Sequence, residues 1–136
     1  MTREIKFRAK IVMDVEPLAM KKGHWVEGYY YEDLHQGEWC SWIKECDDII
    51  HYKVDKNTLG QFTGMFDYSK KEIWEGDIVN VSCLNYTGLT VIKFIDGAFC
   101  MVGENWIESL NGFETDSLDI IGNIHDNPEL MKGGAE

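Results

Sequence analysis

The sequence predicts a mainly-β protein, folded as a small barrel or a sandwich. Apolar and polar residues alternate in many short runs, and hardly any stretch shows the spacing of an amphipathic helix. Turn-forming residues separate these runs, and the chain holds 13 glycines but only two prolines. Short strands at regular spacing are typical of small barrels and sandwiches. At 136 residues, the chain is long enough to bury a hydrophobic core.

Three strands are predicted in the first third of the chain. The segment Glu4–Met13 has an apolar residue at every second position, as in a strand with one buried face. Strand-favouring aromatic residues fill His24–Tyr31, where Gly28 indicates a bulge or a close approach of two backbones. The polar segment Glu32–Gly37 then leads into the third strand, Trp39–Ile43. The two aromatic strands are therefore predicted to form a hairpin with a long loop.

The centre of the chain has the clearest local pattern. A short strand at Ile49–Val54 and a turn at Asp55–Asn57 precede Thr58–Val79, which predicts a strand, a turn and a second strand. Within this stretch, Gly76 can adopt the positive φ of a sharp corner. The carboxylate of Asp77 can accept hydrogen bonds from nearby backbone amides. These two residues therefore mark a corner that leads into a new strand.

The C-terminal third contains the strongest hairpin signal in the sequence. The pair Asp96-Gly97 lies between two apolar runs, and Asp-Gly favours the two-residue turn of a β-hairpin. The segment Glu104–Leu110 fits either a short helix or a strand. Asn127 followed by Pro128 is typical of a helix start, although two later glycines leave room for about one turn. The strands predicted in this part of the chain are Thr90–Ile95, Ala98–Val102 and Leu118–Ile124.

The charge of the chain argues against nucleic acid as a partner. Twenty-four acidic residues face 13 basic ones, which gives a net charge of −11 and a pI near 4.7. Phosphate backbones would be repelled, because nucleic-acid binding normally depends on Lys and Arg side chains. Alternation places Lys6, Arg8 and Lys10 on one side of the first strand, near Arg3. They form either a small basic stripe or an ordinary solvated face.

Several features favour a soluble protein of the cytoplasm with no membrane partner. The sequence is 44% hydrophobic, unlike disordered chains, and has no apolar run of the roughly 18 residues that a membrane span needs. The N-terminal residues alternate between charged and apolar types, unlike a secretory signal. The cysteines have no Cys-x-x-Cys spacing and are expected to be reduced and partly buried. These cysteines are Cys40, Cys46, Cys83 and Cys100.

The best candidates for a metal site are His35, Cys40, Cys46 and His51. Imidazole and thiolate groups are ligands that zinc prefers. The gaps between these residues are four, five and four residues, which match no common zinc finger. Cys40 also lies in an aromatic run that is typical of packing. We therefore expect neither a bound metal nor a cofactor.

No pattern in the sequence points to catalysis. Glu75 and Asp77 share one face of an extended segment, but as exposed neighbours of a corner they are expected to stay ionised and cap the turn. The sequence has no phosphate-binding glycine loop, no Gly-x-Ser-x-Gly motif and no His-Glu-x-x-His helix. Nothing in it marks one thiol as an activated nucleophile. The chain is therefore expected not to be an enzyme.

Aromatic residues are concentrated between positions 25 and 42. Alternation sends Trp25, Tyr29 and Tyr31 to one face of a strand, and Tyr30 with Val26 to the other. Both faces cannot be exposed without leaving a large apolar patch, so one of them is covered by the barrel or by a second chain. The barrel is the favoured cover, and the alternative is an interface with a second chain, because Trp and Tyr are enriched at the centres of interfaces. Its candidate residues are Trp25, Tyr29, Tyr31, Trp39 and Trp42.

Three blocks of the sequence resemble the YopX family of phage and prophage proteins. The first is Arg3–Ala9, which reads Arg-Glu-Ile-Lys-Phe-Arg-Ala. The second combines Gln61–Gly64 with Lys71–Val79, and the third is Ile121–Leu130, which contains Ile-Gly-Asn-Ile and Asn-Pro-Glu-Leu. The resemblance runs nearly end to end. One departure is Ser69-Lys70, where family members often have Asn-Gly, which argues against a two-residue primed turn at this position.

The resemblance implies a fold and a setting, but no activity. The implied fold is mainly β with few short helical turns. It places a β-strand and hairpin extension at residues 1–54 and an SH3-like small barrel at residues 55–130. The two glycines after Leu130 predict a flexible tail at residues 131–136. The family implies a phage or prophage origin in a bacterial cytoplasm. It has no established biochemical activity that this chain would inherit.

Two functions from different classes fit these observations. The first is a non-enzymatic binding or assembly module that forms a homo-oligomer through the aromatic hairpin or through exposed strand edges. The alternative is an acidic inhibitor or adaptor whose negative surface captures a basic host or phage protein, as a DNA mimic would. The net charge of −11 motivates the alternative, and binding of that kind weakens as salt rises.

Overall fold

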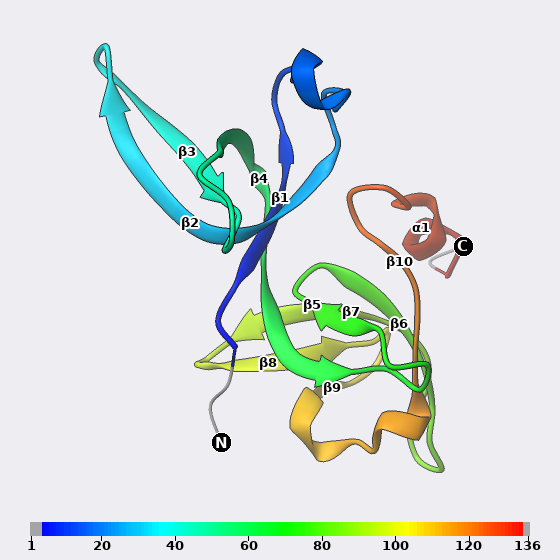
Figure 1. Ribbon diagram of the computed structural model, residues 1–136. Coiled ribbons are helices and arrows are strands. Elements are labelled where there is room, and N and C mark those ends of the chain that lie inside the picture. The colour runs from blue at the N-terminus through cyan, green and yellow to red at the C-terminus, as the bar shows by residue number, and fades with distance from the viewer. Residues whose placement is uncertain (1–3, 135–136) are drawn as a thin grey trace. The chain divides into compact units, whose positions relative to one another are not determined.

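The structure is a computed structural model that describes residues 4–134 (Figure 1). Within these residues it has ten β-strands, three 3₁₀ turns and one short α-helix, which confirms the predicted mainly-β class. None of the described helices is long and apolar enough to cross a membrane. The chain divides into two compact units, Met1–Gln61 and Phe62–Glu136. Arg3, predicted to lie near the basic residues of the first strand, is outside the described residues.

The N-terminal unit is a closed ring of four antiparallel strands. Phe7–Ile11 (β1), Trp25–His35 (β2), Glu38–Lys44 (β3) and the first part of His51–Phe66 (β4) pair in this order. The ring closes because β1 also pairs with β4. A 3₁₀ turn, Glu16–Leu18 (η1), lies between β1 and β2. The N-terminal segment that was expected as a β extension therefore forms a small barrel of its own.

Alternation along these strands separates a buried face from a solvent-facing one. The partly buried ring of Tyr30 packs against the core on the buried face, which also carries Val26. The barrel itself therefore covers this face of β2, which was one of the two alternatives left open by the sequence. The fully enclosed core residues are Ala9, Ile11, Val26, Ile43, Tyr52 and Val54.

Two connections in the N-terminal unit differ from the sequence prediction. The turn between β2 and β3 consists of Gln36 and Gly37 alone, with φ of 50° and 83°. The prediction of a long loop is wrong, because both residues adopt the positive φ of a tight hairpin turn and β2 extends to His35. The predicted turn at Asp55–Asn57 is a bulge inside β4. There the carboxylate of Asp55 accepts a hydrogen bond from the Asn57 amide at 3.0 Å.

The C-terminal unit contains a five-stranded antiparallel sheet of the SH3 type. Its order is β10-β6-β7-β8-β9, so the last strand returns beside the first strand of a four-strand meander, as the resemblance implied. Two 3₁₀ turns, Leu110–Gly112 (η2) and Thr115–Ser117 (η3), connect β9 to β10. The short strand Glu72–Trp74 (β5) pairs with the end of β4. The sheet strands are Asp77–Ser82 (β6), Thr87–Ile95 (β7), Ala98–Val102 (β8), Ile107–Ser109 (β9) and Leu118–Asn123 (β10).

The turn signals of this unit are confirmed, with one correction. Asp96 and Gly97 have φ of 51° and 86° and form the predicted two-residue turn between β7 and β8. Gly76 has a φ of 93°, and the Trp74 amide donates a hydrogen bond to the Asp77 carboxylate at 2.7 Å. The expectation that Asp77 is exposed is wrong, because its side chain is 2% exposed. The corner folds this carboxylate inward onto the backbone.

The structure decides between the helix and the strand that the sequence allowed for Glu104–Leu110. The segment Glu104–Leu110 holds the strand β9 and leads into η2, so it contains no α-helix. The predicted helix start after Pro128 is followed by Glu129–Gly134 (α1). The last two positions of the predicted flexible tail, 135 and 136, lie outside the described residues. The core of this unit consists of Ile73, Val79, Val81, Ile92, Met101, Leu110 and Leu118.

Candidate functional site

The β2–β3 hairpin extends beyond the strands that flank it (Figure 1). β1 pairs with β2 only over Trp25–Gly28, and β4 pairs with β3 only over Trp42–Lys44. Among the described residues, Tyr29–His35 pair only with β3, and Glu38–Ser41 pair only with β2. Residues 29–44 are referred to as the arm. Its edges are open to β-pairing along Tyr29–His35 and Glu38–Ser41, and open edges are places where another chain can add a strand.

The outer face of the arm, opposite the barrel core, is built around an aromatic cluster. Tyr31 stacks on Trp42 with ring centroids 6.4 Å apart, and it meets His51 edge-on at 5.6 Å. The Tyr31 hydroxyl and His51 Nδ1 are hydrogen-bonded at 2.6 Å, and the Trp42 indole donates to Asp33 at 2.8 Å. These bonds fix the rings on the surface. The strand register places ten residues on this face: Tyr29, Tyr31, Asp33, His35, Glu38, Cys40, Trp42, Lys44, His51 and Lys53.

Local contacts shift the pKa of three groups on the arm. The pKa of Tyr29 is raised, first by a side-chain hydrogen bond with Cys46. Burial raises the pKa of the Tyr31 hydroxyl, and the charge of Asp33 adds to this effect. Hydrogen bonds from Tyr30 and then Lys56 lower the pKa of Glu32. At neutral pH the arm therefore presents neutral tyrosines, and Glu32 is ionised.

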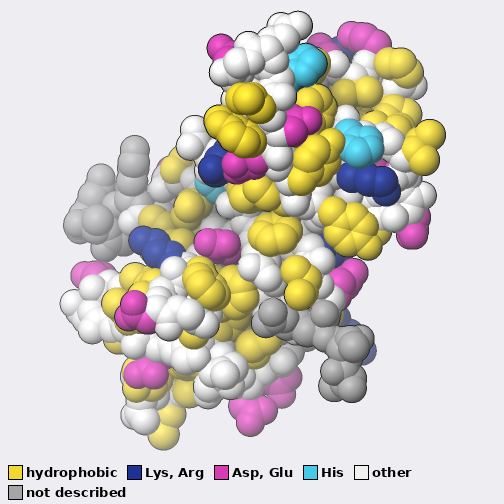
Figure 2. Space-filling view, turned by 90° about the vertical axis from the view of Figure 1, so that its left-hand side faces the viewer, with side chains coloured by type: hydrophobic (Ala, Val, Ile, Leu, Met, Phe, Trp, Pro, Cys, Tyr) yellow, Lys and Arg dark blue, Asp and Glu magenta, His cyan; other side chains and the backbone are white. Residues whose placement is uncertain are grey.

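The remaining predicted interface residues lie elsewhere on the hairpin. Trp39 is on the opposite face near the tip, directly across from Leu34, and these side chains are 71% and 60% exposed. Trp25 is at the base, with the guanidinium of Arg8 4.8 Å and the ammonium of Lys10 5.4 Å from its ring centroid. Hydrophobic, charged and His side chains are intermingled on the upper part of the surface in Figure 2. The predicted interface residues thus divide between two faces and the base.

The structure does not gather the His and Cys residues that were considered for zinc. His35 ends β2 beside the turn, Cys40 is buried in β3, Cys46 is exposed after β3 and His51 belongs to the aromatic cluster. Within residues 4–134, no group of three or more His, Cys, Asp or Glu side chains is placed to hold a metal ion. All four cysteines are free thiols.

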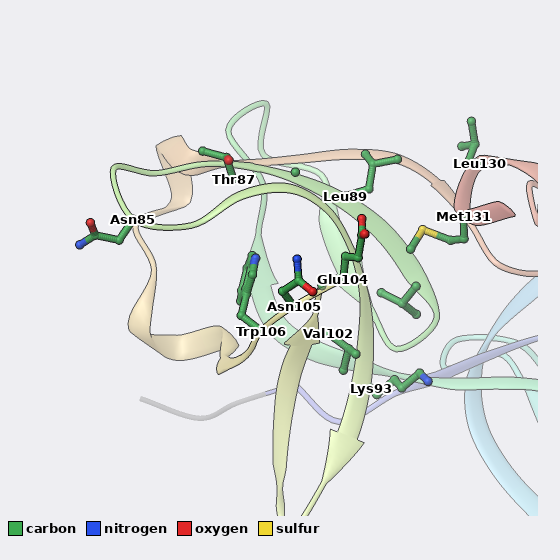
Figure 3. A pocket seen from close by; sticks show the side chains of 13 residues that line it. Asn85, Thr87, Leu89, Lys93, Val102, Glu104, Asn105, Trp106, Leu130 and Met131 are labelled. Carbon is green, nitrogen blue, oxygen red and sulfur yellow. The ribbon is translucent and has the colours of Figure 1, made fainter. Parts of the chain in front are cut away.

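A half-open cleft of about 610 Å³ lies on the sheet of the C-terminal unit (Figure 3). Trp106 forms one wall, Leu89 and Lys93 come from β7, and Met131 comes from α1. Glu104 and Lys93 carry opposite charges, and both line this cleft. This cleft was not predictable from the sequence, because its lining comes from three separate segments. Its apolar walls and two opposite charges suit an amphipathic group.

A shallower hollow of about 530 Å³ lies at the base of the arm. The ammonium of Lys6 lies 3.6 Å from the carboxylate of Glu4 and 3.7 Å from that of Glu27. Lys6 is therefore neutralised by acids, and it does not extend a basic stripe with Arg8 and Lys10. The acidic side chains that line the hollow are Glu4, Glu27, Glu45, Asp47 and Asp48.

Comparison with known proteins agrees with the motifs in the sequence. A sequence model of the YopX protein family matches residues 6–132. The crystal structure of protein yopX from Bacillus subtilis is similar to this chain, with a TM-score of 0.51 and 16% sequence identity. The similarity covers 95% of this chain and 98% of that one, and at this identity it supports the fold alone. No curated protein matches the chain. The chain therefore belongs to the YopX family.

Proposed function

We propose that this protein is a non-enzymatic binding or assembly module that works as a homo-oligomer through its arm. The observation that supports this function is the exposure of large side chains on a hairpin with open edges. Tyr29, Leu34 and Trp39 are each more than half exposed within the arm. Exposed aromatic groups of this kind are enriched at the centres of protein interfaces. The setting we propose is the bacterial cytoplasm, as part of a phage or prophage.

The test is the molecular mass in solution of three proteins at high micromolar concentration, measured by light scattering. The wild type is expected at a multiple of the 15.7 kDa chain mass. The arm variant Tyr29→Ser/Leu34→Ser/Trp39→Ser is expected near one chain mass, because it loses apolar contact area without touching the core. The matched control carries three exposed substitutions in the C-terminal unit and should keep the wild-type mass. It is Leu84→Ser/Phe94→Ser/Ile107→Ser.

Two outcomes would contradict the proposed function. A wild type that remains a strict monomer would remove the homo-oligomer. An arm variant that keeps the wild-type mass would show that the copies meet elsewhere. Circular dichroism of each variant checks that the fold is retained, so a loss of mass can be assigned to the surface.

A second candidate function is the acidic adaptor that captures a basic protein. The five carboxylates around the hollow at the base of the arm, against one lysine, favour it. In that case the wild type would be monomeric and would bind a basic polypeptide such as poly-L-lysine. Binding would weaken as salt rises, because surface charges are screened. The serine substitutions on the arm would leave such binding unchanged.

A further inference from the structure

The charges on the outer face of the arm divide into two halves of opposite sign. Glu38 and Asp33 lie toward the turn, and Lys44 and Lys53 lie toward the base of the arm. Two acids and two lysines cancel, so these four residues carry no net charge although the whole chain has a net charge of −11. The four charges of this face therefore balance, whereas the chain as a whole is acidic.

The positions of these charges follow from the strand register. Glu38 pairs with His35, and Asp33 pairs with Cys40 in the next row of the same face. Side chains on one face of a strand recur at every second residue, about 7 Å apart. Lys53 lies one row further, beside Trp42, and Lys44 lies in the row after that. The order along the arm is therefore acid, acid, base, base.

We propose that this face binds the same face of a second copy of the chain, with the two arms antiparallel. A two-fold axis between the Asp33 row and the Tyr31 row would bring Glu38 against Lys44 of the second copy. It would also place Asp33 in the same row as Lys53 of the second copy, two strands apart across the face, and symmetry makes the Glu38–Lys44 contact twice. Parallel arms would instead set acid on acid and base on base. The charge order thus selects both the partner and its direction.

The aromatic cluster supplies the apolar part of the same contact. Tyr31 and Trp42 stack at the middle of the face, where the two-fold arrangement covers them. Their hydrogen bonds to His51 and Asp33 hold the rings before contact, so little side-chain freedom is lost on binding. A uniformly basic or acidic partner would meet repulsion from one half of the face. An antiparallel second copy instead sets the acidic half of this face against its basic half.

This inference rests on the proposed function, since it specifies how the arm associates. The test exchanges the two charges that meet at the ends of the face. Sedimentation velocity is measured over a concentration series for wild type, Glu38→Lys, Lys44→Glu and the double variant Glu38→Lys/Lys44→Glu. Each single exchange should weaken self-association by about tenfold or more, because it places like charges together twice. The double variant should return to within about threefold of wild type.

The matched control is Glu114→Lys, an exposed charge reversal in the C-terminal unit, which should leave self-association unchanged. The inference is overturned if the single exchanges have no effect, or if the double variant stays as weak as the single ones. Either result could still accompany loss of mass in the serine variant of the arm. If the charge exchanges fail in this way but the serine variant loses mass, the proposed function is supported and the antiparallel charge pairing is contradicted.

Discussion

Replacing Gly28 by alanine is expected to lower the free energy of unfolding by about 3 kcal/mol or more. A Cβ at this position would overlap the carbonyl oxygen of Lys44 and would lie 2.8 Å from the Cα of Glu45. Both are backbone atoms at the end of β3, so neither can move aside without opening the pairing of β2 with β3. The sequence predicted a bulge or a close backbone approach at this glycine, and the structure shows the close approach.

Urea unfolding, monitored by tryptophan fluorescence, measures this loss of unfolding free energy. Gly37→Ala is the matched control, because Gly37 has a φ of 83° but nothing within 4 Å of its Cβ position. That substitution adds only backbone strain, of about 1 kcal/mol. If Gly28→Ala destabilised the protein no more than Gly37→Ala does, the close packing of β2 against the end of β3 would be contradicted.

Replacing Asp67 by alanine is expected to cost about 3 kcal/mol or more of unfolding free energy. The side chain is 0% exposed, and one oxygen accepts hydrogen bonds of 2.9 Å from the amides of Ser69 and Lys71 and from the Ser69 hydroxyl. The other oxygen accepts a bond of 3.1 Å from the Ile120 amide. Alanine would leave these partly buried donors without the carboxylate, and it would remove one of the bonds that hold the turn to β10. Thermal and urea unfolding measure the loss.

The same carboxylate is expected to make stability depend on pH. Burial alone would raise the pKa of Asp67, but the amides of Lys71 and Ile120 and the groups of Ser69 lower it below its ordinary value of 3.8. Its contribution is therefore fully present above this ordinary value, which the unfolded chain keeps, and is lost as pH falls through the folded pKa. Between pH 5 and pH 2, wild type should lose more unfolding free energy than Asp67→Asn does. Parallel curves for the two proteins would contradict this role.

Local turn chemistry was predictable from the sequence because it depends on neighbouring residues. Asp96-Gly97 and Gly76 adopt the positive φ angles that their types favour, and the structure has both predicted corners. Gln36 was missed because a glutamine rarely adopts positive φ, and here the pairing of β2 with β3 holds it there. The segment Asp55–Asn57 has turn chemistry, but the surrounding strand absorbs it as a bulge.

The closure of the N-terminal barrel and the grouping of site residues were not predictable in the same way. Closure depends on pairing between β1 and β4, which are far apart in sequence. Alternation did assign Tyr29 and Tyr31 to the outer face correctly. The contact of Tyr31 with His51 depends on the register of a third strand, which no local pattern encodes. The charge order of the arm likewise emerges only when β2, β3 and β4 are aligned.

The most direct test of the arm as an association surface is hydroxyl-radical footprinting at two protein concentrations. Mass spectrometry reports the oxidation of individual side chains, and Tyr68, 59% exposed in the C-terminal unit, serves as the internal reference. Between low and high micromolar concentration, oxidation of Tyr29 and Tyr31 should fall by about half or more while that of Tyr68 stays constant. Equal oxidation of the arm at both concentrations, or protection that appears at Tyr68 instead, would contradict the account.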